Sequence, residues 1–193
     1  MFSRTLESED LTRTGLSVIQ AGQVHLHTLI LLRWVAAAGQ TATLLLVFFG
    51  LGFELPIIAC FGAVFALISS NLVLVSRGRD RRRITEREVV LLLGFDVLQL
   101  SVLLYLTGGL ANPFIILIIA PAMVSATVLS RGATIGLIVL AMVCISLLGL
   151  YHLPLPWQGS PIKLQPTYLL AIWTALAVAV VFITTYVWSV SEE

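Results

Sequence analysis

The sequence contains six long apolar runs separated by short polar, glycine-rich or proline-rich segments, and this pattern constrains the fold most strongly. A bilayer has a hydrocarbon core of about 30 Å, which an α-helix crosses with its backbone groups hydrogen-bonded internally. The chain is 59% hydrophobic and 11% charged, whereas roughly a quarter of the residues in soluble domains are charged. The sequence therefore predicts an all-α integral membrane protein, a bundle of six transmembrane helices. The expected spans are residues 29–49, 55–75, 89–106, 114–129, 133–151 and 168–190.

The basic residues predict how these spans are oriented. Of the 11 Lys and Arg residues, Arg33 lies within a span and Lys163 lies in the loop between the fifth and sixth spans. The others lie in the polar tail of residues 1–28, in the loop of residues 76–88, or at position 131. Because basic loops stay on the cytoplasmic side, both termini are predicted to be cytoplasmic. The basic loop requires no nucleic-acid partner, since anionic lipid headgroups lie beside it.

The link between the third and fourth spans has the composition of a sharp turn that re-enters a helix. Gly108 and Gly109 can adopt positive φ without steric cost. Asn112 precedes a proline and is therefore pushed towards the extended conformation of a helix N-cap. Pro113 suits the first helical position, and Phe114 begins the next apolar run. We expect free N–H groups at this capped helix start, facing the membrane interface.

The flanking spans suggest a ligand for these donors. The runs before and after the link would form about 27 Å and about 24 Å of helix, so the link is drawn towards the hydrocarbon. A flat, neutral, carbonyl-bearing molecule dissolved in lipid could accept hydrogen bonds there and stack on Phe114 or Tyr105. A quinone fits this description. The residues alone favour the simpler interpretation, in which the link is a turn without a ligand.

Polar residues within the spans form a second candidate site. Arg33, Asn71 and Asp96 fall in one layer near the cytoplasmic side, and Gln40 and Gln99 lie deeper. A carboxylate within hydrocarbon must be paired or neutral, so we expect an Arg33–Asp96 ion pair with Asn71 bonded to a spare carboxylate oxygen. The alternative is that Asp96 carries a proton or couples to a ligand. The structural interpretation is favoured, because the layer lies far from the link.

Several kinds of chemistry have no motif in this sequence. It contains no phosphate-binding loop, no metal-ligand spacing and no paired carboxylates, so we predict neither a catalytic residue nor a metal site. The two cysteines, Cys60 and Cys144, lie inside apolar runs and are expected to pack there. The chain has the character of the membrane portion of a longer protein, in which residues 191–193 begin the connection to a cytoplasmic region.

The heptapeptide Gly-Gly-x-x-Asn-Pro-Phe at residues 108–114 carries a family resemblance. Leu32-Arg33-Trp34 followed by Gly39-Gln40 agrees with it, as does the arginine-rich second cytoplasmic loop. With these motifs, the chain resembles the membrane domain of the RegB/PrrB/ActS group of redox-responsive sensor histidine kinases in proteobacteria. The resemblance implies a multi-pass protein of the bacterial inner membrane that forms a homodimer.

The resemblance also implies a function for the link. In this family the heptapeptide is regarded as part of a ubiquinone site, which would assign quinone binding to Gly108, Gly109, Asn112, Pro113 and Phe114. Tyr105 is a further candidate for stacking. Oxidised quinone would favour the inactive kinase, and a site that offers only donors would prefer the quinone to the quinol. ATP binding, histidine phosphorylation and transfer to a response regulator would belong to a cytoplasmic region that this sequence lacks.

Two other functions are compatible with the composition. The first is a small-molecule transporter or channel subunit, although polar groups near the bilayer midplane are limited to Gln40 and Gln99. The second is an anchor and dimerisation module, in which the link has a structural role only.

Overall fold

The computed structural model describes residues 27–53, 55–78, 85–154 and 165–191, and within these ranges the regular structure is entirely helical. The first helix spans His27–Gly50, and its last turn is the π-helical segment η1, Leu46–Gly50. The remaining α-helices are α2 (Ile57–Gly78), α3 (Glu86–Leu106), α4 (Ile119–Val128), α5 (Arg131–Leu150) and α6 (Pro166–Ser191). Two short 3₁₀ segments, η2 (Gly109–Ala111) and η3 (Pro113–Ile118), precede α4.

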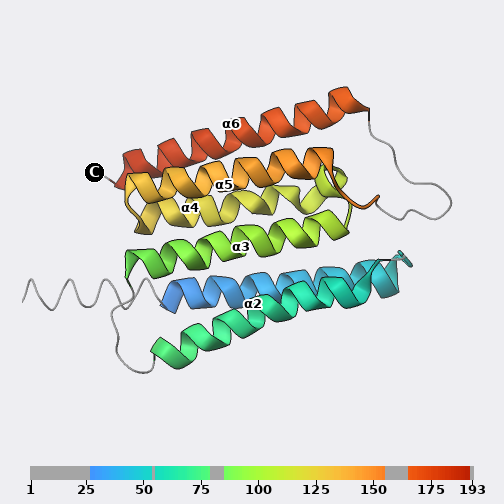
Figure 1. Cartoon of the computed structure of the whole chain (residues 1–193), viewed down its shortest axis with the longest axis horizontal. Coiled ribbons are helices and arrows are strands. Elements are labelled where there is room, and N and C mark those ends of the chain that lie inside the picture. Colours follow the sequence, from blue (N-terminus) through green and yellow to red (C-terminus); the bar gives the residue numbers. More distant parts are fainter. Residues whose placement is uncertain (1–26, 54, 79–84, 155–164, 192–193) are drawn as a thin grey trace, which may run out of the picture.

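The helices lie side by side and alternate in direction along the chain (Figure 1). The start of the first helix and the C-terminal end of α6 therefore lie at one end of the bundle, and the link between α3 and α4 lies at the other. Five helices are long and apolar enough to cross a membrane, whereas the sixth apolar segment, Pro113–Val128, is shorter. The prediction of an all-helical bundle is thus confirmed, with five helices of spanning length.

The predicted ends of the chain fall mostly beyond the described residues. The tail of residues 1–28 lies outside them apart from its last two residues, which already belong to the first helix. Residues 192–193 and the central part of the basic loop, residues 79–84, also lie outside.

The third helix begins earlier than the apolar run predicted, because a polar cap extends it. The Thr85 side chain accepts from the Glu88 N–H, and Glu88 bonds the Thr85 N–H in return, which forms a capping box. Ser130 caps α5, and its own N–H donates to Glu86 Oε1 at 3.0 Å. This bond ties the start of α5 to the start of α3.

The fourth apolar segment differs from the single helical span expected over residues 114–129. Its first part is the 3₁₀ segment η3, and α-helical geometry begins only at Ile119. Pro121 has no N–H to offer the Leu117 carbonyl, which accepts from the Ile119 N–H instead. A 3₁₀ turn rises about 2.0 Å per residue rather than about 1.5 Å, so the segment reaches about 27 Å. The change of helix type therefore lengthens the shortest span.

The largest core cluster lies between α3, α5, α6 and the link. Its most buried members include Val97, Ile118, Ile145 and Val180, each with no exposed surface. Large apolar side chains cover the outside of the bundle as well, for example Ile58, which is 87% exposed. An apolar exterior of this kind is suited to contact with lipid.

Candidate functional site

The two glycines of the link both adopt positive φ, as the sequence predicted. Gly108 has φ 110° and Gly109 has φ 57°. These values reverse the chain immediately after α3 and lead it into η2. A side chain would be strained at either position, so the glycine pair is required by the backbone.

Asn112 fixes the shape of the link through both the oxygen and the nitrogen of its side-chain amide. It has the extended conformation of an N-cap, with φ −78° and ψ 124°. Its Oδ1 accepts from the Phe114 N–H at 2.8 Å. Its Nδ2 donates to the Thr107 carbonyl at 3.1 Å and to Thr107 Oγ1 at 2.7 Å. Asn112 is 8% exposed, so these bonds satisfy a buried amide and clamp the end of α3 to the start of η3.

The expectation of free N–H groups at this helix start is wrong. Pro113 has no N–H, the Phe114 N–H is bonded to Asn112 Oδ1, and the Ile115 N–H donates to the Asn112 carbonyl at 3.1 Å. The 3₁₀ geometry explains the difference, because it closes a hydrogen bond one residue earlier than an α-helix would. The backbone at this cap therefore offers no free donor to a ligand, and recognition there falls to side chains.

The end of α5 covers the link. His152 Nδ1 lies 3.0 Å from the Leu148 carbonyl, and the Leu153 N–H donates to the Tyr105 carbonyl at 2.9 Å. A Cβ added at Gly109 would lie 2.6 Å from the Cβ and Cγ of His152 and 2.8 Å from the Leu148 carbonyl oxygen. Gly109 is thus needed for this close approach as well as for its positive φ.

His152 is the residue of this region that sequence reasoning missed. It follows the fifth apolar run in a loop that has no recognisable motif, so only its place at the outer end of a span could have drawn attention to it.

Two aromatic residues beside the link remain accessible. Tyr105 near the end of α3 is 41% exposed, and Phe114 at the start of η3 is 43% exposed. Their neighbours Leu110 and Ile115 are 3% and 5% exposed and belong to the core. The link therefore combines a buried, hydrogen-bonded backbone with aromatic surface on its outside, an arrangement that could receive a flat apolar ring.

The polar layer at the other side of the bundle contains the predicted ion pair. Arg33 Nη2 and Nε lie 2.8 and 3.1 Å from Asp96 Oδ1, and Nη2 also donates to Ser70 Oγ at 2.6 Å. Arg33 is 3% exposed and Asp96 is 15% exposed. The Arg33 guanidinium also lies 6.0 Å from the centre of the Phe95 ring. A buried pair with these additional contacts joins the first helix to α2 and α3.

The role expected of Asn71 is wrong. Asn71 does not reach the carboxylate of Asp96, and its Nδ2 donates to the Ile30 carbonyl at 3.3 Å. Consecutive helical residues point in different directions, so Ser70 faces the ion pair and Asn71 does not. Gln99 Nε2 donates to Gln40 Oε1 at 3.0 Å, one layer deeper.

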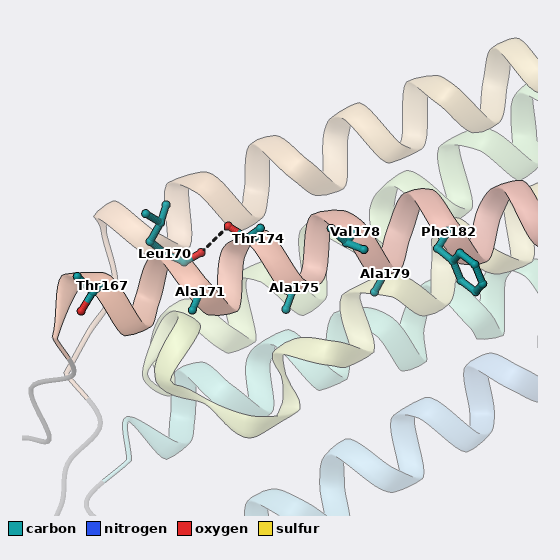
Figure 2. Close-up of a pocket in the computed structure, with 8 residues that line it drawn as sticks. All are labelled: Thr167, Leu170, Ala171, Thr174, Ala175, Val178, Ala179 and Phe182. Carbon is teal, nitrogen blue, oxygen red and sulfur yellow. Dashed lines mark hydrogen bonds between the residues drawn. The ribbon is translucent and has the colours of Figure 1, made fainter.

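A groove with a volume of about 750 Å³ lies elsewhere, along the exposed side of α6. Figure 2 shows Ala171, Ala175 and Ala179 along this side, with Thr174 bonded to the carbonyl of Leu170. None of the predicted quinone residues lines this groove. The two cysteines are free and buried, in agreement with the packing role expected for them.

Comparison with known proteins identifies relatives of the chain. It is 38% identical to the sensor histidine kinase RegB of Cereibacter sphaeroides over 162 residues, which are 83% of this chain and 35% of that protein. Over most of its length, the chain is a homologue of RegB. A second RegB sequence from the same species is 44% identical over 78 residues, 40% of the chain and 17% of the relative.

The alignment limits what the RegB relationship covers. The chain spans about a third of the length of its RegB relative. No protein-family model matches it, and no solved structure does. Together, the relationship and the apolar helices indicate a membrane sensor domain.

Proposed function

We propose that this chain is the membrane-embedded sensor domain of a histidine kinase in the bacterial inner membrane, with six spans and both termini in the cytoplasm. The observation that carries the proposal is the match to RegB over 83% of the chain. The alternating direction of the helices supports the topology, because it brings the start of the first helix, the start of α5 at Arg131 and the C-terminal end of α6 to the same end of the bundle (Figure 1). The short fourth segment spans most of the hydrocarbon once its 3₁₀ part is included.

The sensed ligand in this proposal is ubiquinone, bound at the link between α3 and α4. Gly108, Gly109, Asn112 and Pro113 set the backbone shape, and Phe114 supplies a stacking surface beside it. Tyr105 offers a second aromatic face with a hydroxyl group. The residues fit a quinone head group in two respects: the link carries no charge, and its aromatic surface is open to the lipid from which a quinone would arrive.

Signal output would leave through α6, whose C-terminal end lies at the same end of the bundle as the start of the first helix (Figure 1). In the full-length protein, the region beyond it would bind ATP, phosphorylate a histidine and pass the phosphate to a response regulator. The protein would act as a homodimer. A ligand alters such an output only if its affinities for the active and inactive states differ, so the oxidised and reduced ligands must make different contacts at the link.

The proposal is tested by quinone binding to the purified chain in lipid nanodiscs. Phe114→Ala should weaken the affinity for a short-chain ubiquinone by about 5- to 150-fold, the range that corresponds to losing about 1–3 kcal/mol of apolar and aromatic contact. Phe65→Ala on α2 is the matched control, because Phe65 is 69% exposed and remote in sequence from the link. Binding that is absent from the wild-type chain, or equal in both variants, would contradict the proposal.

The same preparation separates this function from the alternatives. A transporter or channel would allow solute flux across liposomes that contain the chain, whereas a sensor would bind quinone without flux. An anchor module would do neither.

A further inference from the structure

The ring of His152 is held in a defined orientation against the link. Its Nδ1 lies 3.0 Å from the Leu148 carbonyl oxygen. A carbonyl oxygen can only accept a hydrogen bond, so Nδ1 must carry the proton that is shared between them. In the neutral imidazole, Nε2 then has a lone pair and acts as an acceptor. The contact with Leu148 thus fixes the tautomer as well as the position of the ring.

The surroundings of His152 bring its side chain against the link that carries the candidate quinone residues. The side chain is packed against Gly109 so closely that no Cβ fits between them. The next residue, Leu153, is bonded to the carbonyl of Tyr105. His152 is only partly buried, and among the described residues no partner is found for Nε2. Within the described part of the chain, Nε2 is therefore an unused acceptor on a ring that lies against Gly109 of the link.

An acceptor at this point distinguishes the two oxidation states of a quinone. A quinone oxygen can only accept a hydrogen bond, whereas a quinol hydroxyl can also donate one. Nε2 can pair with the quinol hydroxyl and leaves a quinone oxygen unpaired. The Phe114 and Ile115 amides at the helix start are already bonded to Asn112, so neither of them distinguishes the two forms, whereas a side-chain acceptor can.

We propose that His152 is a further binding residue of the link site and supplies a hydrogen bond that only the reduced ligand can form. This inference rests on the proposed function, because it assumes that a quinone binds at the link. It adds a residue outside the heptapeptide, and this residue distinguishes the quinol from the quinone. Phe114 contributes equally to the binding of both forms.

Two variants of His152 test this role in different ways. His152→Asn keeps an N–H close to the position of Nδ1 and removes the acceptor at Nε2. His152→Phe keeps the size of the ring and removes both nitrogen atoms. Each variant would be placed in lipid nanodiscs and titrated anaerobically with a short-chain ubiquinone and with the corresponding quinol. Circular dichroism would verify that the helical content is preserved.

Both variants should weaken quinol binding by about 5- to 100-fold relative to quinone binding, the range expected when one hydrogen bond is lost. Their affinity for the quinone should stay within about twofold of wild type. Phe114→Ala should weaken both forms together and leave their ratio unchanged. This contrast separates a group that reads the oxidation state from a residue that merely shapes the site.

The outcomes distinguish this inference from the function on which it rests. If wild type binds both forms and neither His152 variant changes their ratio, the role of His152 is overturned and the quinone site stands. If wild type binds neither form, both proposals are overturned.

Discussion

The polar layer and the link solve the same problem, burial of polar groups within a membrane protein, in different ways. In the polar layer, side chains bond to side chains on other helices: Arg33 and Asp96 are 63 residues apart, and Gln40 and Gln99 are 59 apart. In the link, the bonds are local, and Asn112 reaches only to Thr107 and Phe114, five and two residues away. The polar layer therefore fixes the helices relative to one another, whereas the link fixes its own shape.

This difference has a consequence for signalling. In the proposed function, a ligand at the link would alter a locally bonded segment without breaking the long-range contacts that align the first helix, α2 and α3. The contact between the link and the end of α5 offers a route by which such a change reaches the rest of the bundle. Variants in the two regions should consequently differ in what they disturb, overall stability in one case and ligand response in the other.

The largest loss of stability is expected for Asp96→Ala. It leaves the Arg33 guanidinium buried without its partner, which costs about 3–5 kcal/mol. The double variant Arg33→Met, Asp96→Leu removes both charges and should recover most of that loss. Thermal unfolding of the chain in detergent, followed by circular dichroism, measures both. A double variant as unstable as the single one would show that the ion pair is not what stabilises the layer.

The next largest effect is expected for Gly109→Ala. The new Cβ would lie 2.6 Å from His152 in a residue with φ 57°, and positive φ alone costs alanine about 1–2 kcal/mol. Gly136→Ala in α5 is the matched control, since nothing lies within 4 Å of its added Cβ and alanine favours a helix by about 1 kcal/mol. The same unfolding measurement should show opposite signs for the two variants. A neutral Gly109→Ala would argue against the close contact between His152 and the link.

Asn112→Ala should have an intermediate effect. It removes the cap of η3 and the two bonds to Thr107, so a loss of about 1–2 kcal/mol is expected. Thr107→Val removes only the hydroxyl and should cost less, about 1 kcal/mol. Asn112→Ala should also weaken quinone binding, because the link loses the clamp that sets its shape. Equal binding by wild type and Asn112→Ala would show that the ligand does not depend on this clamp.

The smallest stability change is expected for Phe114→Ala. The side chain is 43% exposed on the outside of the link, and surface substitutions usually change stability by about 0.5 kcal/mol or less. Unfolding curves of wild type and variant should nearly coincide while quinone affinity falls. A large loss of stability would mean that Phe114 packs as a core residue and would weaken its assignment to the ligand site.

The all-helical architecture with five of its apolar helices, the glycine turn, the Asn112 cap and the Arg33–Asp96 pair could be predicted from sequence. Each depends on local conformational preference or on the high cost of an unpaired charge in hydrocarbon. Both effects can be inferred from one amino-acid sequence. Ser70 and Asn71 are adjacent on α2. The sequence does not show which of them faces the ion pair, because it does not give the rotation of α2 about its axis.

The 3₁₀ start of the fourth segment and the position of His152 were beyond sequence reasoning for a related reason. The 3₁₀ geometry depends on which N–H groups bond to the carbonyls between the link and Pro121. The spacing of residues in the sequence does not determine this. His152 reaches Gly109 only because α5 ends beside the link, which is a property of the packed bundle.

The most direct test of the account is to locate the quinone on the chain. A photoreactive short-chain quinone would be cross-linked to the protein in lipid nanodiscs, and the labelled peptides would be identified by mass spectrometry. The account predicts labelling of residues 105–115 and of the segment around His152, suppressed by excess ubiquinone. Labelling confined to the groove on α6 or to the helices around Arg33 would contradict it.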